Sequence, residues 1–236
     1  MMPSSEIFDV VVVGGGPSGA TAAHDLARLG RSVLLLDRAG RIKPCGGAIP
    51  PRLIRDFAIP DRLLVAHVNA ARMVSPSDKQ VDMPIDGGFV GMVDREVFDE
   101  WLRQRAACAG AIRRTGLFKR FEYDEAGRTI VHYDERGADG STTAKTVSAR
   151  ALIGADGALS AVARQCLPGA ERLPYVFAYH EIVRSPPADS NFDGARCDVY
   201  YRGTVSPDFY GWVFPHGDTV SVGTCCRPVA RTARRR

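Results

Sequence analysis

Three glycines and one aspartate near the start of the chain have the types and spacing needed to bind a dinucleotide. Gly14, Gly16 and Gly19 stand at GxGxxG spacing. In such a turn the first glycine permits a tight bend, the second lets backbone approach a pyrophosphate, and the third lets helix pack closely on strand. Asp37 follows about twenty residues later, where a carboxylate accepts ribose hydroxyls and repels a 2′-phosphate. The pattern predicts a site for FAD or NAD rather than NADP.

This chemistry requires a strand before the glycines and a helix after them, and the sequence supplies both. Residues 10–13 form an apolar, β-branched run typical of a strand buried on both faces. A helix is expected over about residues 18–29, with alanines facing the sheet and Gly30 after its end. Its N-terminal N–H groups would point at the phosphates. Residues 33–36 form a second buried strand that ends on Asp37.

Composition is that of an ordinary soluble globular protein. The 236 residues suffice for one large or two modest domains, and 45% are hydrophobic and 25% charged. A net charge of only +4 does not indicate a surface that binds nucleic acid. No apolar run approaches the roughly 20 residues that span a bilayer, and no secretory signal is visible, so the chain is expected in the cytosol.

The cysteines show no metal-binding pattern. Six are scattered along the chain, without CxxC pairs or a Cys/His cluster at zinc spacing. We therefore predict no metal site, and we expect most of these thiols to be buried small residues in a reducing compartment.

A second candidate segment follows the aspartate. Clustered Gly and Pro in residues 39–57 predict an irregular loop that runs next to the nucleotide. Within it, Cys45, Gly46 and Gly47 either bring backbone close to a flat cofactor or form a plain connection with an inert thiol.

The next stretch predicts strands and one helix. Strands are expected at residues 71–74, 80–85 and 89–93. Asp94 is a good N-cap for a helix that ends at Gly110, in which Val97, Trp101, Leu102 and Arg105 recur at helical spacing.

Arg95 in the first turn of this helix is unusual, because the helix dipole disfavours a cation there. It either serves a nearby anion, such as a cofactor phosphate, or is a solvated side chain paired with Glu96 or Asp99.

A β meander and a second strand-turn-helix junction follow. The meander strands are expected at residues 117–123, 129–133 and 146–153, and a short helix at about 160–166. Between them, Asp156 could accept hydrogen bonds from the ribityl chain of a cofactor, while Gly157 leaves room for it; an ordinary turn is the alternative.

Beyond Pro168 the pattern changes to short, aromatic strands at residues 176–183, 197–201, 210–214 and 219–223. These predict an antiparallel sheet in a second lobe. The expected division is a dinucleotide-binding domain at 1–168, a partial substrate domain at 169–223 and an atypical basic tail at 224–236.

Six stretches together carry a family resemblance: GGGPSG, KPCGGAIPPR, GFVGMVDREVFDEWL, LIGADGALSAVAR, PYVFAYHEI and DFYGWVFPHGD. They resemble the geranylgeranyl reductase family of flavoproteins, most closely the branch that reduces the tail of bacteriochlorophyll or chlorophyll. The likeness spans about residues 8–223. It implies an α/β, Rossmann-like FAD-binding fold of the p-hydroxybenzoate hydroxylase class with an antiparallel β substrate lobe, here incomplete.

The resemblance also implies roles for individual residues. The cofactor-binding set is Gly14, Gly16, Gly19, Asp37, Arg38, Gly46, Gly47, Arg95, Asp156 and Gly157. The family signature YxWxFP stands here as Tyr210, Trp212, Phe214 and Pro215, which would line a prenyl pocket. Strand alternation places residues 210, 212 and 214 on one face, as such a wall requires. The proton donor is not identified; Cys45, His216 and Tyr210 are the candidates.

The implied reaction uses NADPH to reduce FAD, which then delivers hydride to an unactivated C=C bond of a geranylgeranylated pigment or geranylgeranyl diphosphate. Such a substrate implies peripheral contact with an inner or photosynthetic membrane. An aromatic monooxygenase of the same fold, or an inactive truncated remnant, are the alternatives.

The sequence departs from the family after Gly223, where Thr224 and Cys225 replace the usual continuation to GxG. Residues 224–236 have no periodicity and an excess of arginine, so they are either a frameshifted or a genuine basic tail. A GDAAG-type stretch and a helical C-terminal region are expected from the family and do not follow. On its own, a chain without them is expected to be unstable or inactive.

Overall fold

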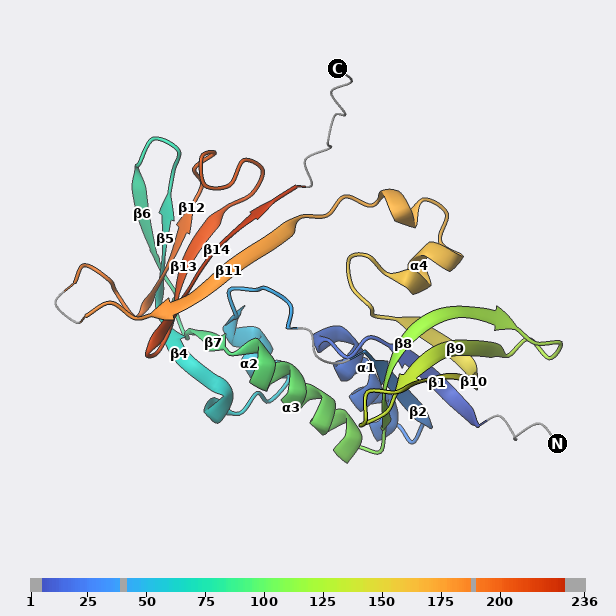
Figure 1. Cartoon of the computed structure of the whole chain (residues 1–236). Helices are drawn as coiled ribbons and strands as arrows, with labels where there is room; N and C mark the ends of the chain where they lie inside the picture. Colours follow the sequence, from blue (N-terminus) through green and yellow to red (C-terminus); the bar gives the residue numbers. More distant parts are fainter. Residues whose placement is uncertain (1–5, 39–41, 188–189, 228–236) are drawn as a thin grey trace, which may run out of the picture. The chain divides into compact units, whose positions relative to one another are not determined.

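The computed structural model describes residues 6–38, 42–187 and 190–227, which belong to two compact units (Figure 1). The first unit comprises Met1–Arg41 and Asp99–Leu173, and the second comprises Ile42–Phe98 and Pro174–Arg236. Each unit is thus built from two separate stretches of chain. This differs from the expected boundary at residue 168, because residues 70–74 pair with residues 196–200 in the second unit.

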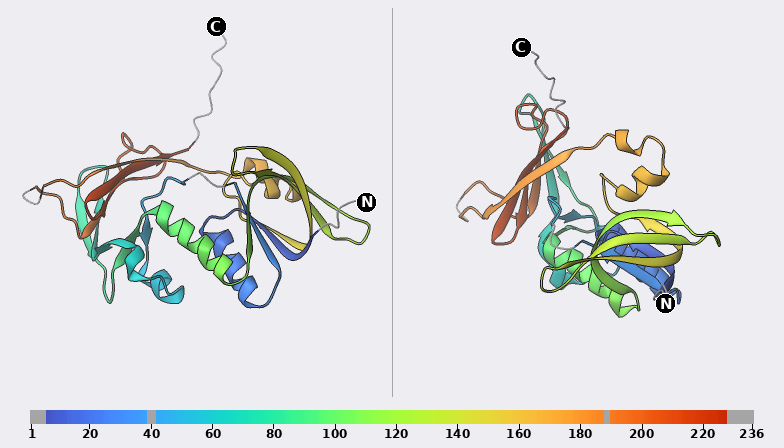
Figure 2. Two further views of the ribbon diagram at one scale, coloured as in Figure 1. Left: turned by 60° about the horizontal axis from the view of Figure 1, so that its bottom comes forward. Right: turned by 45° about the vertical axis from the view of Figure 1, so that its right-hand side comes forward.

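The first unit is a closed ring of five strands in the order β1-β10-β9-β8-β2 (Figure 2). The strands are β1 (Ile7–Val13), β2 (Val33–Asp37), β8 (Ile112–Tyr123), β9 (Thr129–Arg136) and β10 (Thr142–Gly154). Strand β1 pairs in parallel with both β2 and β10, and β2 pairs in parallel with β8. The remaining pairs, β8-β9 and β9-β10, are antiparallel, as the predicted meander requires.

The core of this unit explains why the apolar runs form strands. Val11, Leu34 and Val131 are fully buried and pack in one cluster with Tyr133. Residues 10–13 of β1 and 33–36 of β2 have the unbroken burial expected of parallel strands covered on both faces. The predicted buried strands at 10–13 and 33–36 are confirmed.

Helix α1 (Pro17–Arg28) starts directly after the glycines. Pro17 occupies its first turn, where the missing N–H costs nothing, and Gly30 follows its end with φ +74°. Ala20, Ala23 and Ala27 are its buried alanines, so the predicted small-residue face is confirmed. The unit also contains the short helix α4 (Ala161–Cys166) and the 3₁₀ turn η2 (Ala170–Arg172).

The second unit holds a six-stranded sheet, β11-β14-β13-β12-β5-β6, and a three-stranded sheet, β3-β7-β4. The large sheet consists of β5 (Ala70–Val74), β6 (Gln80–Pro84), β11 (Phe177–Arg184), β12 (Arg196–Tyr200), β13 (Gly211–His216) and β14 (Thr219–Cys226). The small sheet consists of β3 (Ala48–Ile49), β4 (Leu64–Val68) and β7 (Val90–Val93). Strands β5 and β12 pair in parallel, and this pairing joins the two stretches of the unit.

Among the described residues of this unit, four elements were not expected from sequence: α2 (Pro51–Asp56), η1 (Asp61–Leu63), β3 and β4. Residues 39–57 were predicted to be irregular, but α2 forms within them, with Pro50 as its N-cap. The clustered prolines, interpreted as helix breakers, sit at the start of the helix, where proline is favoured. The 3₁₀ turn η1 leads into β4, in which more buried and more exposed side chains alternate along the strand.

Helix α3 (Arg95–Cys108) begins as predicted at Asp94, whose Oδ1 accepts the Glu96 N–H at 2.8 Å. Of the residues noted at helical spacing, Leu102 is buried whereas Val97 is 55% exposed. The buried apolar side chains are Phe98, Leu102 and Ala106, which recur every four residues.

Two expectations about the C-terminal stretch and the thiols need correction. Strand β14 continues through Thr224 to Cys226, so part of the predicted tail belongs to the sheet; residues 228–236 lie outside the described residues. All six cysteines are free thiols, but only Cys197 and Cys225 are buried.

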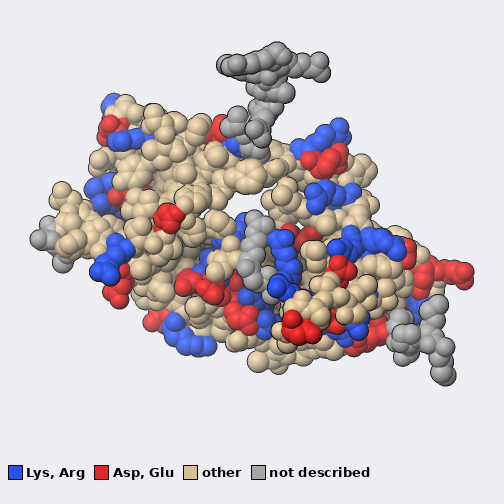
Figure 3. Space-filling model, in the orientation of Figure 1, with Lys and Arg blue, Asp and Glu red and all other residues tan. Residues whose placement is uncertain are grey.

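Charged side chains of both signs are interspersed on the face shown in Figure 3, in keeping with the small net charge. Within the described residues, no helix is long and apolar enough to cross a membrane. Nor does this part of the chain gather three or more His, Cys, Asp or Glu side chains in a metal-binding group.

Replacing Leu34 by Ala should destabilise the first unit by about 2–5 kcal/mol, because the side chain is fully buried and leaves a cavity. Leu29→Ala is the matched control: its side chain is 75% exposed, and the change should stay within about 0.5 kcal/mol. Urea denaturation followed by circular dichroism measures both. Equal losses would show that Leu34 does not belong to the core.

Candidate functional site

The glycine turn between β1 and α1 is shaped by close contacts of backbone with backbone. A side chain at Gly19 would overlap the carbonyl oxygen of Gly14, and one at Gly14 would overlap the carbonyl of Ala155. Gly14 also has φ +106°, which disfavours any other residue. Around Gly16, by contrast, no protein atom lies within 4 Å of where a side chain would begin. The open space beside Gly16 therefore fits the predicted room for a pyrophosphate.

Asp37 lies at the end of β2 and contacts this turn. Its Oδ2 accepts the Gly15 N–H at 2.7 Å. A side chain at Gly15 would begin 2.8 Å from Asp37 Cβ and 3.0 Å from Arg103 Cδ, so this glycine is also required. The aspartate predicted to bind ribose thus also fixes the backbone of the predicted phosphate turn.

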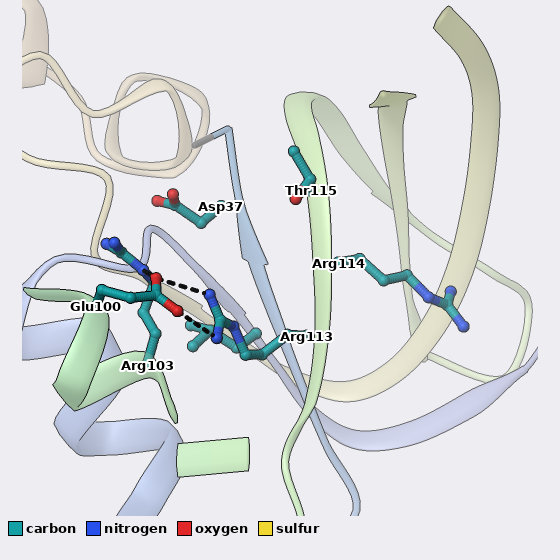
Figure 4. A pocket seen from close by; sticks show the side chains of 7 residues that line it. Asp37, Glu100, Arg103, Arg113, Arg114 and Thr115 are labelled. Atoms are coloured by element: carbon teal, nitrogen blue, oxygen red, sulfur yellow. Dashed lines mark hydrogen bonds and ion pairs between the residues drawn. The ribbon is translucent and has the colours of Figure 1, made fainter. Parts of the chain in front are cut away.

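A pocket of about 450 Å³ opens beside Asp37 (Figure 4). This volume is within the range of small-molecule sites. Its lining residues are Leu35, Asp37, Glu100, Arg103, Arg113, Arg114 and Thr115. In Figure 4, Arg103 and Arg113 converge on Glu100, whereas Arg114 points away from them and instead contacts Glu6 and the Tyr133 hydroxyl. The pocket is therefore polar where Asp37 and Glu100 face it.

Glu100 is held as a carboxylate. Arg113 donates to both of its oxygens, at 2.9 and 3.0 Å, and Arg103 Nε donates at 2.9 Å. Burial alone would raise the pKa of Glu100, but the hydrogen bonds from Arg113 and Arg103 outweigh it and lower the pKa. These three residues were not predicted from sequence, although Glu100 and Arg103 are spaced three apart on a helix, as a side-chain pair requires.

Asp156 follows β10 at the same end of the sheet as Gly14. Its carboxylate accepts the Ser160 hydroxyl and the backbone N–H of Ala161, the latter at 2.6 Å, and so anchors the start of α4. Gly157 has φ +90° and open space around it. Asp156 therefore has a structural role in fixing the start of α4. Its contact with a ribityl chain remains a prediction.

The two predicted cofactor-binding arginines lie on different elements. Arg38 is exposed directly after β2 in the first unit. Arg95 is half-buried in the first turn of α3 and is counted with the second unit. Their roles remain predictions.

In the second unit, the Cys45-Gly46-Gly47 segment packs against the aromatic strand β13. A side chain at Gly46 would begin 2.5 Å from the Phe214 ring and 3.2 Å from Trp212 Nε1. Gly47 has φ +75°, and its carbonyl accepts the Val93 N–H at 2.9 Å. Both glycines are therefore required by packing within the unit, whatever cofactor contact they make.

The residues of the aromatic signature differ in exposure. Trp212 and Phe214 lie on one face of β13 and are only 4% and 9% exposed, within an apolar cluster. Tyr210 is half-buried, 6.2 Å from Trp212 between ring centroids, so it has more surface to offer a ligand. Pro215 is buried on the opposite face of the strand.

Tyr210 is also a candidate proton donor, and its surroundings shift the pKa of its phenol. Burial raises the pKa of its phenol, and the nearby thiols of Cys225 and Cys45 raise it further. The phenol is therefore protonated at neutral pH. Cys45 is half-buried near it, and His216 Nδ1 lies 3.1 Å from the Phe214 carbonyl.

A hydrogen-bonded chain that the sequence did not reveal orients Trp212. The indole Nε1–H donates to Ser221 Oγ at 3.1 Å, and His180 Nδ1 lies 3.2 Å from the same oxygen. Ser221 accepts from the indole, and its bond with Nδ1 has a direction set by the tautomer of His180. Burial, followed by the proximity of His216, lowers the pKa of His180, against the opposing effect of Glu181.

Comparison with known proteins identifies the family. Residues 8–209 match the family described as FAD binding domain. The chain belongs to this family of FAD-binding domains. The match includes the glycine turn, Asp37 and most of both units, and the predicted FAD-binding fold is confirmed.

Two individual relatives allow a closer comparison. A geranylgeranyl diphosphate reductase of Rhodobacter capsulatus is 60% identical over 216 residues, covering 92% of this chain and 54% of the relative. The chloroplastic geranylgeranyl diphosphate reductase of Oryza sativa subsp. japonica is 41% identical, covering 94% and 50%. The chain spans about half the length of these relatives. They confirm the resemblance to the geranylgeranyl reductase family.

Solved structures agree on the fold. A geranylgeranyl bacteriochlorophyll reductase-like protein of Thermoplasma acidophilum superposes with a TM-score of 0.76 at 26% identity, covering 94% of this chain and 57% of that one. The myxobacterial chondrochloren halogenase, at 20% identity, has a TM-score of 0.70 over 93% and 53% of the two chains, and this shows the shared fold.

The glycine turn of this FAD-binding family member can be tested by two alanine substitutions. Gly16→Ala should change the free energy of unfolding by less than about 1 kcal/mol, because its side chain meets open space, but lower FAD affinity about tenfold. Gly19→Ala should cost about 3 kcal/mol, because the methyl overlaps Gly14. Denaturation and flavin-fluorescence titration measure the two effects. Gly203→Ala, also in open space, is the control, and an equal loss of affinity there would contradict the assignment.

The His180 chain predicts acid sensitivity. The pKa of His180 in the folded chain lies below its ordinary value of 6.5, so the unfolded chain binds this proton more readily. The contribution of neutral His180 to stability is therefore complete above pH 6.5 and is lost as the pH falls through the pKa of the folded state. The free energy of unfolding should therefore fall between pH 7.5 and 5.5. His180→Asn, which keeps a hydrogen-bonding side chain but cannot titrate, should lose less over that interval in urea denaturation. Identical losses would exclude His180 as the cause.

Proposed function

We propose that this chain is the FAD-binding portion of a geranylgeranyl reductase, which saturates C=C bonds of a geranylgeranyl group with electrons from NADPH. The observation that supports this most strongly is the 60% identity to the Rhodobacter capsulatus reductase over 92% of the chain. Such identity exceeds what the shared fold alone requires, since the halogenase has the same fold at 20%.

The residues around the glycine turn fit the cofactor. Gly14, Gly16 and Gly19 would hold the pyrophosphate of FAD, and Asp37 would accept a ribose hydroxyl in the adjacent pocket. Arg38, Gly46, Gly47, Arg95, Asp156 and Gly157 complete the proposed set. When bound, FAD supplies a two-electron carrier between the nicotinamide and the alkene.

The chain must then orient the alkene and provide a proton. Hydride adds to one alkene carbon and a proton to the other, so each saturated bond consumes one NADPH and one proton. Tyr210 is one of the three candidate donors: its phenol is half-buried and protonated at neutral pH, and the burial that raises its pKa also makes it a weaker acid. Cys45 and His216 are the other candidates.

Tyr210, Trp212, Phe214 and Pro215 form the proposed prenyl-binding set. Because Trp212 and Phe214 are almost fully buried, they would mainly shape the pocket wall, and Tyr210 would make more of the direct contact. The substrate is a geranylgeranylated pigment or geranylgeranyl diphosphate. A tail of this kind favours peripheral contact with a membrane surface, which we include in the proposal.

The assay supplies FAD, NADPH and geranylgeranyl diphosphate without oxygen, and mass spectrometry counts the hydrogens gained by the prenyl group. The chain is tested alone and together with the remaining half of the Rhodobacter capsulatus relative. Gains of two mass units per saturated bond, with matching NADPH oxidation, are expected in at least the second arrangement. NADPH oxidation that occurs only with oxygen would indicate a monooxygenase instead. If neither arrangement shows turnover, with oxygen or without it, the chain is an inactive remnant.

Tyr210→Ala tests the substrate contact in that assay. It should raise KM about tenfold, because a half-buried aromatic that contacts the prenyl chain is lost. Tyr123→Ala, which removes a 68% exposed ring from the first unit, is the control and should leave KM unchanged. An unaltered KM in Tyr210→Ala would remove this residue from the pocket.

A further inference from the structure

The peptide groups around Gly15 are held from two sides by side chains distant in sequence. Asp37 Oδ2 accepts the Gly15 N–H at 2.7 Å. Arg103 Nη1, from α3, donates to the Gly15 carbonyl at 3.1 Å. Both side chains also crowd the place where a Gly15 side chain would begin. The middle of the glycine turn is therefore clamped between β2 and α3.

Fixing the Gly15 carbonyl fixes the next N–H as well. The Gly15 carbonyl and the Gly16 N–H belong to one planar trans peptide group, in which they point in opposite directions. Arg103 thus orients the Gly16 N–H away from itself. Gly16 is also the N-cap residue of α1 and lies beside the open space described above. Its N–H is consequently one of the donors at the start of the helix that an anion would meet.

Arg103 is itself held in place. Its Nε donates to Glu100 Oε2 at 2.9 Å, and Glu100 receives two further hydrogen bonds from Arg113 on β8. Figure 4 shows the two arginines on either side of the Glu100 carboxylate. Arg103 is 21% exposed, so water competes for it only partly. The bidentate pair of Arg113 with Glu100 gives this partly exposed network a defined geometry.

We propose that Arg103 is a positioning residue for the cofactor pyrophosphate, and that the Glu100–Arg113 pair holds it in the required orientation. The proposal rests on the proposed placement of FAD at the glycine turn. Arg103 acts through the Gly15–Gly16 peptide rather than by touching the flavin. The guanidinium of Arg103 bridges a backbone carbonyl and a carboxylate, and its planar set of N–H donors suits this geometry. The ammonium group of a lysine would reproduce these two contacts only in part.

The test measures FAD affinity by quenching of flavin fluorescence in four variants of the full chain. Arg103→Met should weaken binding about tenfold, and Arg103→Lys about threefold. Arg113→Met should also weaken it about threefold, because Arg103 then loses part of its support. Arg120→Met, which removes an arginine paired with Glu122 elsewhere in the same unit, should bind like the unmodified chain.

A second measurement uses the chain without FAD. Hydrogen exchange at Gly14 and Gly15, whose N–H groups are bonded to Leu36 O and Asp37, reports how firmly the turn is held. Exchange there should be about tenfold faster in Arg103→Met and unchanged in Arg120→Met, with similar melting temperatures for the two.

The outcomes separate this proposal from the one on which it rests. If Arg103→Met binds FAD as tightly as the unmodified chain, or if Arg103→Lys restores affinity completely, the positioning role is wrong while the cofactor site stands. If the unmodified chain binds no FAD either alone or together with the remaining half of the Rhodobacter capsulatus relative, the proposed cofactor placement fails, and this proposal fails with it. Faster exchange combined with the graded loss of affinity supports it.

Discussion

The first unit depends on how closely the backbone approaches itself between Gly14 and Gly19. The Gly14 carbonyl occupies the space that a side chain at residue 19 would fill, so α1 starts immediately beside the end of β1. At that same end, the Gly14 N–H bonds to Leu36 O and the Ala155 N–H to Val13 O. The ends of three parallel strands are thereby tied together, and Asp37 is brought to the start of the helix. A ligand site at the carboxyl ends of such strands follows from this geometry.

Close approach also shapes the second unit, but there it involves backbone against aromatic rings. Gly46 lies beside Phe214, and a side chain at Gly223 would overlap the Trp212 indole. The indole in turn is held by Ser221 and, through it, by His180. The aromatic face is therefore rigidly specified, with two glycines providing space and one polar chain providing orientation. Such fixed walls suit a site that must hold a flexible ligand in one position.

Much of this arrangement could be predicted from sequence, and the reasons for success and failure are physical. Residues 10–38 were predicted well because strand, turn and helix there are local, and the close approach of Gly19 to Gly14 is short-range as well. The helix within residues 39–57 was missed because its prolines signal both an end and a beginning. The Arg103 contact was missed because it joins residues 88 apart. Nothing in local periodicity reveals which side chains the fold brings together over that distance. Relatives and fold confirmed the family resemblance, whereas the individual cofactor and substrate residues remain predictions.

The parallel pairing of β5 with β12 has a consequence for how the chain acquires its structure. Residues 70–74 meet residues 196–200 in adjacent strands, and the ring of the other unit joins residues 7–13 to 148–154. Neither unit can be completed while its second segment is still being synthesised, so strand edges with unpaired backbone groups persist during translation. Long-range, partly parallel pairings of this kind form slowly and leave the nascent chain open to association with other chains. Expression at low temperature, or with chaperones that bind extended segments, should therefore raise the yield of folded protein.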